Sequence, residues 1–178
     1  MAVSTLLEAN DLPPFYIGAG IFQFPVVKGL KDNIQVSISH CDDIGIALAF
    51  PEEHPLGLDI EKISNQRIDV MKSHVSAKEI ELLQACGLSS APGLALAWTA
   101  KEALSKVLRT GLTADFAMLE ISTMNSSGAA YTSTFRHCAQ YQALSYYSGD
   151  YACSIVLPGK TTANLEPLFD CFKAVVST

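Results

Sequence analysis

The sequence predicts an α+β fold in which antiparallel hairpins pack with amphipathic helices. Segments 35–50 and 142–157 both show the pattern of strand, turn and strand. Their turns fall at Asp42-Asp43 and at Gly149-Asp150. Between them, residues 98–109 carry apolar side chains at helical spacing. The similarity between the two hairpins is slight, so it leaves open whether the chain consists of two related halves.

Length and composition restrict the class of protein. A chain of 178 residues fits one domain, 1–178, or two small halves at about 1–58 and 59–178 that share a core. Apolar residues make up 49%, which is enough for a core. The net charge of −6 argues against nucleic-acid binding. The five cysteines are an odd number without CxxC spacing, which indicates reduced thiols in a cytoplasmic protein.

The first half of the chain is predicted to be mostly β-structure. Residues 16–27, interrupted by two glycines and a proline, predict one or two irregular strands. The hairpin at 34–50 follows, and alternating apolar residues at 56–60 predict a further short strand. The polar stretch 63–75 is predicted to be a loop. No apolar run approaches the roughly 18 residues of a membrane span.

Two helices are predicted next. Ser76 and Glu79 have the spacing of a capping box at the start of the first helix, which Gly87 ends. Residues 89–92, with a proline in the first turn, begin the second helix, and Gly111 ends it.

The remaining elements have weaker signals. Strand patterns at 118–121 and 130–135 flank a predicted turn at 125–128. The hairpin at 141–157 follows, and apolar residues at helical spacing in 165–176 predict a terminal helix that packs on the core.

Two acidic side chains share one face of the predicted strand at 56–61. Asp59 and Glu61 lie roughly 6.6 Å apart along the strand and point the same way. They repel unless a positive charge lies between them, and Mg²⁺ is suited to that place because it prefers oxygen ligands. The alternative is an edge strand whose acidic face is simply solvated. The strand alone favours that alternative.

The predicted helix at 98–109 adds an acid and a base. Glu102 and Lys106 lie four residues apart, on the side opposite the apolar stripe. The structural alternative is an exposed ion pair worth about 0.3–0.5 kcal/mol. Lys101 lies about 100° round the helix from Glu102 and is predicted to face solvent or another partner.

Together these stretches resemble the motifs of the 4'-phosphopantetheinyl transferases. The motifs are Gly-Leu-Asp-Ile-Glu at 57–61 and Trp-Thr-Ala-Lys-Glu at 98–102 continued to Lys106. Ser39-His40 resembles the Ser-His of the larger, surfactin-synthetase-activating subfamily. The resemblance covers about 33–157. It implies a pseudo-dimer of two related α+β halves, with coenzyme A in the cleft between them.

The resemblance also implies an enzyme that moves the phosphopantetheine arm of coenzyme A to a serine of an acyl or peptidyl carrier protein. Asp59, Glu61 and Glu102 would hold Mg²⁺. Lys106 would donate to a phosphate oxygen. Glu79 has two interpretations of equal weight, a helix cap and a general base that takes the serine proton directly or through water.

The nucleotide end of coenzyme A has weaker candidates. The resemblance assigns Ser39 and His40 to it, and Lys28 and Lys31 are candidates for the 3'-phosphate. The basic element that the larger subfamily carries in its first half is not found here. Either the first half is trimmed, or the chain is a domain of a larger synthase.

Charge distribution indicates where a carrier protein would bind. Residues 1–61 hold nine acidic residues and two lysines, whereas residues 62–178 hold nine acidic and ten basic residues. Carrier proteins are typically acidic, so the docking surface is expected in the second part. The acidic first part also suits an alternative function, a degenerate domain that binds a carrier or stabilises a synthase without catalysis.

Overall fold

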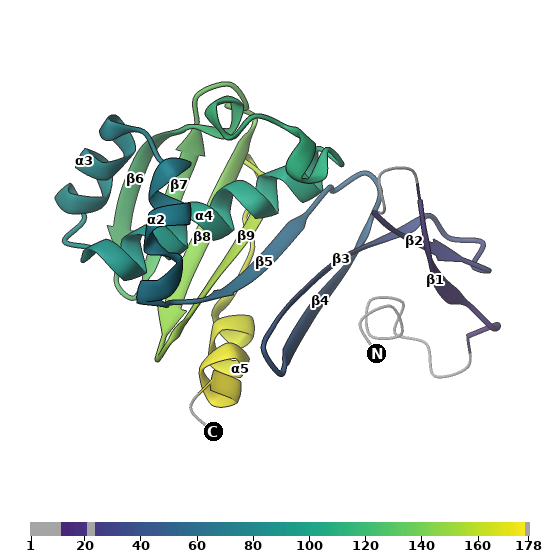
Figure 1. The fold of residues 1–178 in the computed structure, drawn as a ribbon. Helices are drawn as coiled ribbons and strands as arrows, with labels where there is room; N and C mark the ends of the chain where they lie inside the picture. Colours follow the sequence, from purple (N-terminus) through teal and green to yellow (C-terminus); the bar gives the residue numbers. More distant parts are fainter. Residues whose placement is uncertain (1–11, 21–23, 177–178) are drawn as a thin grey trace.

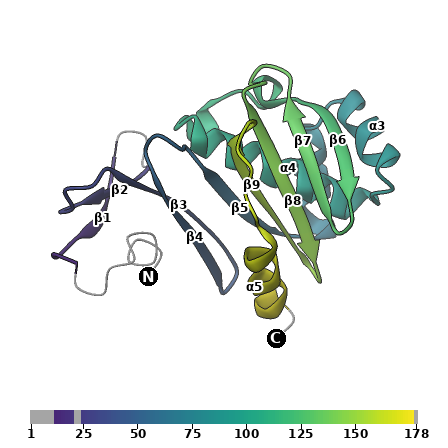
Figure 2. The ribbon, with the colours of Figure 1, turned by 180° about the vertical axis from the view of Figure 1, so that it is seen from behind.

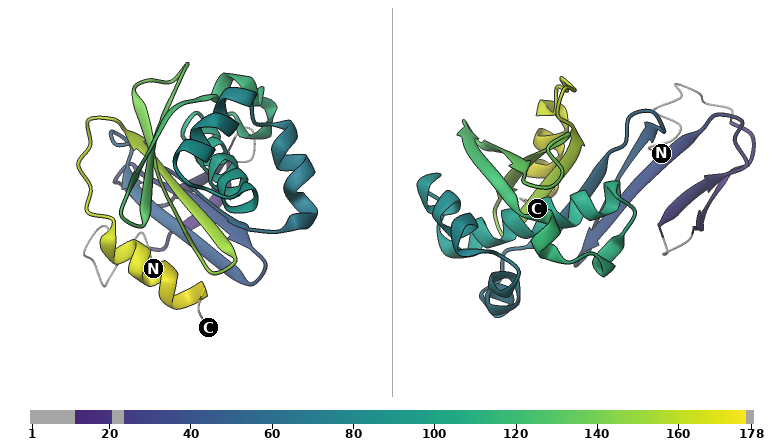
Figure 3. Two further views of the ribbon diagram at one scale, coloured as in Figure 1. Left: turned by 90° about the vertical axis from the view of Figure 1, so that its left-hand side faces the viewer. Right: turned by 90° about the horizontal axis from the view of Figure 1, so that it is seen from above.

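The computed structural model describes residues 12–20 and 24–176. Two antiparallel sheets lie next to each other, and the helices gather on the larger sheet (Figure 1). The smaller sheet has the strand order β1-β2-β3-β4. Its strands are β1 (Tyr16–Ala19), β2 (Pro25–Lys28), β3 (Ile34–Cys41) and β4 (Ile44–Pro51). Strands β1 and β2 lie farthest from the helices (Figure 3).

The larger sheet has the strand order β5-β9-β8-β7-β6. Its strands are β5 (Gly57–Lys62), β6 (Ile121–Ser127), β7 (Ala130–Phe135), β8 (Tyr141–Ser148) and β9 (Tyr151–Pro158). Helix α4 (Ser90–Val107) packs on one face of this sheet, and helix α5 (Glu166–Val176) packs on the other (Figure 2). The α+β class is therefore confirmed.

The two predicted hairpins are confirmed and closely matched. Strands β3 and β4 have eight residues each, as do β8 and β9. Each pair is joined by a two-residue turn, and the residues that open the turns, Asp42 and Gly149, have φ values of 51° and 53°. A pseudo-dimer of two α+β halves is not confirmed, because no helix occurs among residues 12–20 and 24–56. The proposed division at residue 58 lies within β5 and stays a prediction.

Helix α4 is the buried centre of the fold. It begins where the sequence predicts but ends at Val107, before the predicted Gly111, because Arg109 has left-handed backbone with φ 57°. Its apolar residues form one core with α2 (Ile68–Ser73), α3 (Ala77–Ala85) and the larger sheet. Gly57 allows β5 to approach it closely, because a Cβ at this position would lie 1.9 Å from the carbonyl oxygen of Ala103. The side chains that share the face of Gly57 on β5 therefore point towards α4.

The region before α4 is more helical than predicted. Residues 63–75 contain a 3₁₀ turn at Asn65–Arg67 and helix α2 (Ile68–Ser73), so the predicted loop is wrong. Burial of Met71 in the core stabilises this short helix against its polar sequence. Helix α3 (Ala77–Ala85) has the predicted capping box and is followed by Gly87 with φ 72°.

Two predictions after α4 are corrected. Phe116–Leu119 forms a 3₁₀ turn, and the strand that was predicted at 118–121 begins only at Ile121. Strand β6 continues to Ser127, so residues 125–127 of the turn predicted at 125–128 belong to the strand instead. Within the described part of the chain, no single helix is long and apolar enough to cross a membrane, whereas α3 and α4 as one bent pair meet that criterion.

Candidate functional site

The candidate site lies where β3, β5 and α4 meet. Strand β5 is the edge of the larger sheet, and serine side chains of β3 bond to its backbone. The amide of Leu58 donates to Ser37 Oγ at 3.0 Å, and the amide of Ile60 donates to Ser39 Oγ at 3.4 Å. Because these bonds come from side chains, the two sheets meet here without forming a continuous ladder.

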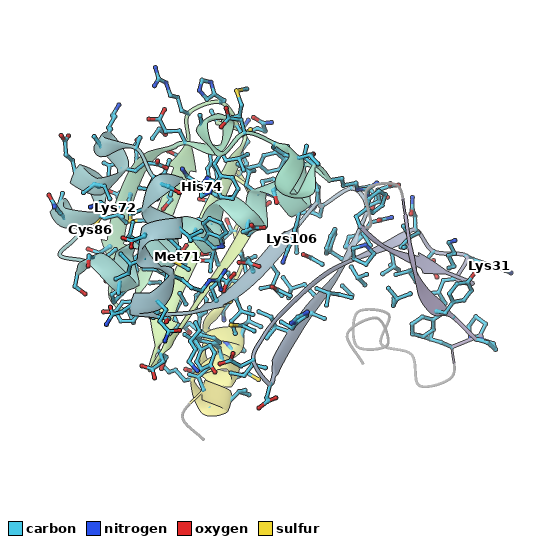
Figure 4. All side chains as sticks on the ribbon, in the orientation of Figure 1. Lys31, Met71, Lys72, His74, Cys86 and Lys106 are labelled. Carbon is cyan, nitrogen blue, oxygen red and sulfur yellow. The ribbon has the colours of Figure 1, made fainter. Side chains whose placement is uncertain are left out.

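Lys106 reaches from α4 into this junction (Figure 4). Its Nζ donates to the carbonyl oxygens of Ile38 at 3.2 Å and Leu58 at 2.8 Å, and to Asp59 Oδ1 at 2.8 Å. An ammonium group has three N–H donors, so these acceptors use all of them. The described residues contain no ion pair between Lys106 and Glu102, so the exposed pair considered from the sequence is not formed.

Asp59 is buried, with 5% of its surface exposed. Its Oδ1 accepts from Ser39 Oγ at 2.7 Å as well as from Lys106, whereas its Oδ2 is buried without a hydrogen-bond partner. Burial raises the pKa of Asp59, and Lys106 and Ser39 act in the opposite direction. The solvated acidic face considered from the sequence is therefore wrong for this residue. A buried carboxylate oxygen without a partner is costly and requires an explanation.

Glu102 is half-buried on α4 and is electrostatically coupled to the carboxylates of β5. Burial raises its pKa to about 7, and the charges of Asp59 and Glu61 act in the same direction. Lys106 and Arg67 partly offset this rise. Glu61 itself forms an ion pair with Arg67, whose Nη2 lies 3.3 Å from Glu61 Oε1. The sequence did not predict Arg67 as a partner.

Three carboxylates near one another suit a hard cation. Asp59 Oδ2 is without a partner, and the charges of Asp59 and Glu61 add to the burial that raises the pKa of Glu102, so a cation placed here would be favourable. No group of three or more His, Cys, Asp or Glu side chains in the described part of the chain is arranged as a ready-made metal site. The residues therefore fit a cation by their chemistry, but Glu61 has to leave Arg67 to contribute.

Glu79 lies in a second polar cluster, on the other side of α4. Its oxygens accept from the amides of Ser76 and Ile121, both at 2.8 Å, and from Lys101 Nζ at 2.8 Å. Lys101 also donates to the carbonyl oxygen of His74 at 2.8 Å. The side chains of Glu79 and Lys101 are each 2% exposed. The cap role is confirmed. Of the two alternatives for Lys101, another partner is confirmed and solvent is wrong, because a buried ammonium group requires a paired carboxylate.

The remaining candidates lie at different distances from Lys106. Ser39 belongs to the junction, and His40 follows it as an exposed residue of β3. Lys28 is exposed at the end of β2, 6.0 Å from the centre of the Tyr16 ring. Lys31 lies far from Lys106, at the outer end of the smaller sheet (Figure 4).

A cleft of about 240 Å³ lies beside Lys106, between the smaller sheet and the end of α4. Arg109 lines this cleft and was not predicted to be a site residue. Its nearness to Lys106 in the sequence was one signal, but Arg109 lies past the end of α4 with φ 57°, so helical spacing does not place it.

Two comparisons with known proteins show what this chain is similar to. Residues 55–156 match the model of a family described as the 4'-phosphopantetheinyl transferase superfamily. The chain is also 33% identical over 99 residues to enterobactin synthase component D of Salmonella typhi, a match that covers 54% of this chain and 42% of that protein. The chain thus spans less than half the length of this relative. Strand β5, α3 and α4 lie within the family match, whereas β1 to β4 precede it.

Proposed function

Because this chain belongs to the 4'-phosphopantetheinyl transferase superfamily, we propose that it transfers 4'-phosphopantetheine from coenzyme A to a serine of an acyl or peptidyl carrier protein. We further propose that it belongs to the larger, surfactin-synthetase-activating subfamily, on the basis of Ser39 and His40 before β5. The observation that supports the activity best is the convergence of Lys106 with Asp59 and Glu102, where one buried carboxylate oxygen lacks a partner.

The proposed reaction is an in-line displacement at the β-phosphate of coenzyme A. The serine oxygen forms a bond to the β-phosphorus and its proton passes to water, while the bond to the oxygen that bridges to the α-phosphate breaks. Adenosine 3',5'-bisphosphate leaves with that oxygen. Such a reaction depends mainly on positioning and on stabilising the negative charge of the phosphates.

Lys106 supplies one positive charge to this reaction. Its three donors are engaged with Ile38, Leu58 and Asp59, so it exchanges one of these bonds for a phosphate oxygen. The bond to the Ile38 carbonyl is the longest of the three, at 3.2 Å, and is the one we expect to be exchanged. A lysine suits this role because its ammonium group is a compact point charge.

The carboxylates are proposed to hold the metal. Asp59, Glu61 and Glu102 would bind Mg²⁺, which would supply further positive charge against the pyrophosphate when bound. Asp59 is already held in place by Ser39 and Lys106, so its free oxygen has a fixed direction. Arg67 competes for Glu61 and has to release it.

Glu79 was the candidate for the general base. Its oxygens are bonded to the amides of Ser76 and Ile121 and to Lys101, and only 2% of its side chain is exposed. Direct transfer of the serine proton to Glu79 would disrupt this buried pair. We therefore propose that Glu79 holds Lys101 and the start of α3, and that any part in proton transfer runs through water.

Intact-protein mass spectrometry tests the proposed activity. An apo carrier protein incubated with this protein, coenzyme A and Mg²⁺ should gain the mass of phosphopantetheine, and EDTA should prevent the gain. No gain with several classes of carrier, together with no stabilisation of this protein by coenzyme A, contradicts the proposal. That result favours the alternative of a non-catalytic domain.

A further inference from the structure

The cleft beside Lys106 contains a second cation that the proposed reaction does not use. Arg109 follows the end of α4 and lines the cleft together with Lys106. Glu52 is the acidic residue among the described residues that line it. The lining of this cleft contains two cations and one acid, although Lys106 is also paired with Asp59 behind it and the whole chain carries −6. An anionic group is therefore the expected occupant.

The guanidinium group of Arg109 is held in position by neutral partners. It lies 4.9 Å from the centre of the Phe24 ring, and its Nη2 donates to Gln35 Oε1 at 3.0 Å. Stacking on an aromatic ring fixes the plane of a guanidinium without neutralising its charge. A guanidinium has five N–H donors, so most of them are still available for a ligand.

The ion pair of Arg109 with Glu52 does not block the site. The closest nitrogen and oxygen atoms lie 3.9 Å apart, and the two side chains are 43% and 48% exposed. An exposed pair at this distance contributes little energy. A phosphate dianion that binds two guanidinium donors in parallel forms a stronger interaction than this carboxylate does.

The two cations are spaced along one strand. Lys106 bonds to Ile38 of β3, whereas Arg109 bonds to Gln35 of the same strand. Three residues of a strand span roughly 10 Å. A nucleotide with its pyrophosphate at Lys106 and its ribose in the cleft thus presents a second phosphate towards Arg109.

We propose that Arg109 binds the 3'-phosphate of coenzyme A, with Phe24 holding its guanidinium in place. This inference rests on the proposed function, which puts the pyrophosphate at Lys106. It replaces the two candidates from the sequence, Lys28 and Lys31, of which Lys31 lies far from Lys106 (Figure 4). Arg109 and Lys106 then hold the two phosphate groups of one molecule from a single helix end.

The experiment compares coenzyme A with 3'-dephospho-coenzyme A as donors in the mass-spectrometric assay. For the wild-type protein, the KM for coenzyme A should be about tenfold or more below that for the dephospho form. Arg109→Gln should raise the KM for coenzyme A by about tenfold or more and leave the KM for the dephospho form within about twofold. Glu52→Gln should lower the KM for coenzyme A but not the KM for the dephospho form, because it removes the carboxylate that competes for Arg109.

Two variants serve as controls. Arg136→Gln removes an exposed arginine outside the cleft, which pairs with Glu120, and should leave both KM values unchanged. Lys31→Gln tests the competing assignment. The proposal is wrong if Lys31→Gln causes the selective loss, or if Arg109→Gln changes both donors equally or neither of them. Melting temperatures of all variants check that they fold.

A binding measurement keeps the test independent of turnover. Adenosine 3',5'-bisphosphate should raise the Tm of the wild-type protein more than adenosine 5'-monophosphate does, and Arg109→Gln should abolish this difference. Absence of transfer from either donor contradicts the proposed function. In that case, the comparison of the two nucleotides still tests whether Arg109 binds a 3'-phosphate. Equal stabilisation of the wild-type protein by the two nucleotides overturns the assignment of Arg109.

Discussion

Two lysines of α4, five residues apart, each meet a buried carboxylate, but the two pairs differ in how fully their polar atoms are bonded. Lys101 and Glu79 are each 2% exposed, and both oxygens of Glu79 have partners. Lys106 and Asp59 are 27% and 7% exposed, and Asp59 Oδ2 has none. Glu102, next to Lys101 in sequence, has a pKa raised to about 7 by burial and by Asp59 and Glu61.

This difference separates a structural role from a functional one. A buried ion pair whose atoms are all bonded fixes one arrangement of the chain, here the contact of α3 and β6 with α4. An incompletely bonded cluster of like charges costs free energy that a ligand of opposite charge recovers. We infer that the ion pair of Lys101 with Glu79 stabilises the fold, whereas the cluster around Lys106 is the reaction centre.

The largest expected effect comes from removing one charge of the incompletely bonded cluster. Glu102→Gln keeps the shape of the side chain but removes its negative charge, so transfer should fall roughly 10²–10³-fold. The fold should persist, because Glu102 is half-buried and makes no ion pair among the described residues. The rate of mass gain by the carrier measures the effect. An active Glu102→Gln would contradict the assignment of the metal ligands.

A smaller effect is expected on the pH dependence of stability. Glu102 has a pKa of about 7 in the folded protein and 4.5 as its ordinary value, so the folded state binds this proton more tightly. Its stabilising contribution is complete below about pH 4.5 and is lost as the pH rises towards 7. In EDTA, the Tm of the wild-type protein should therefore fall between pH 5 and pH 8 by roughly 2–4 °C more than that of Glu102→Gln.

The matching control for this prediction is the addition of Mg²⁺ at pH 8. The cation should raise the Tm of the wild-type protein and have less effect on Glu102→Gln. If the Tm values of the two proteins change equally with pH in EDTA, the pKa of Glu102 is not raised in the folded protein.

Local patterns in the sequence predicted much of the fold. Turn residues at Asp42 and Gly149 marked the two hairpins, and the capping box at Ser76 marked the start of α3. These features depend on residues close together in the chain, so a single sequence reveals them. Helix α2 was missed because its formation depends on burial of Met71 against distant segments.

The sequence indicated Asp59, Glu102 and Lys106 as residues of one candidate site, but not how they pair. Spacing placed Glu102 and Lys106 together on α4, but it gave no indication that Lys106 turns to β5 instead of to Glu102. The burial of Lys101 was missed for a related reason. Helical geometry places Lys101 about 100° from Glu102, and only the tertiary fold brings Glu79 to that side. Arg109 depends on the approach of β3 and Phe24, which are distant in sequence.

The most direct test of the different roles of the two pairs compares Lys101→Met with Lys106→Met by urea unfolding and by transfer to a carrier. Lys101→Met leaves Glu79 buried without its cation and should lower the free energy of unfolding by about 3–5 kcal/mol. Lys106→Met should cost less, about 1–2 kcal/mol, because its site is partly exposed, yet it should abolish transfer. Equal losses of stability, with transfer unaffected by Lys106→Met, would contradict the account.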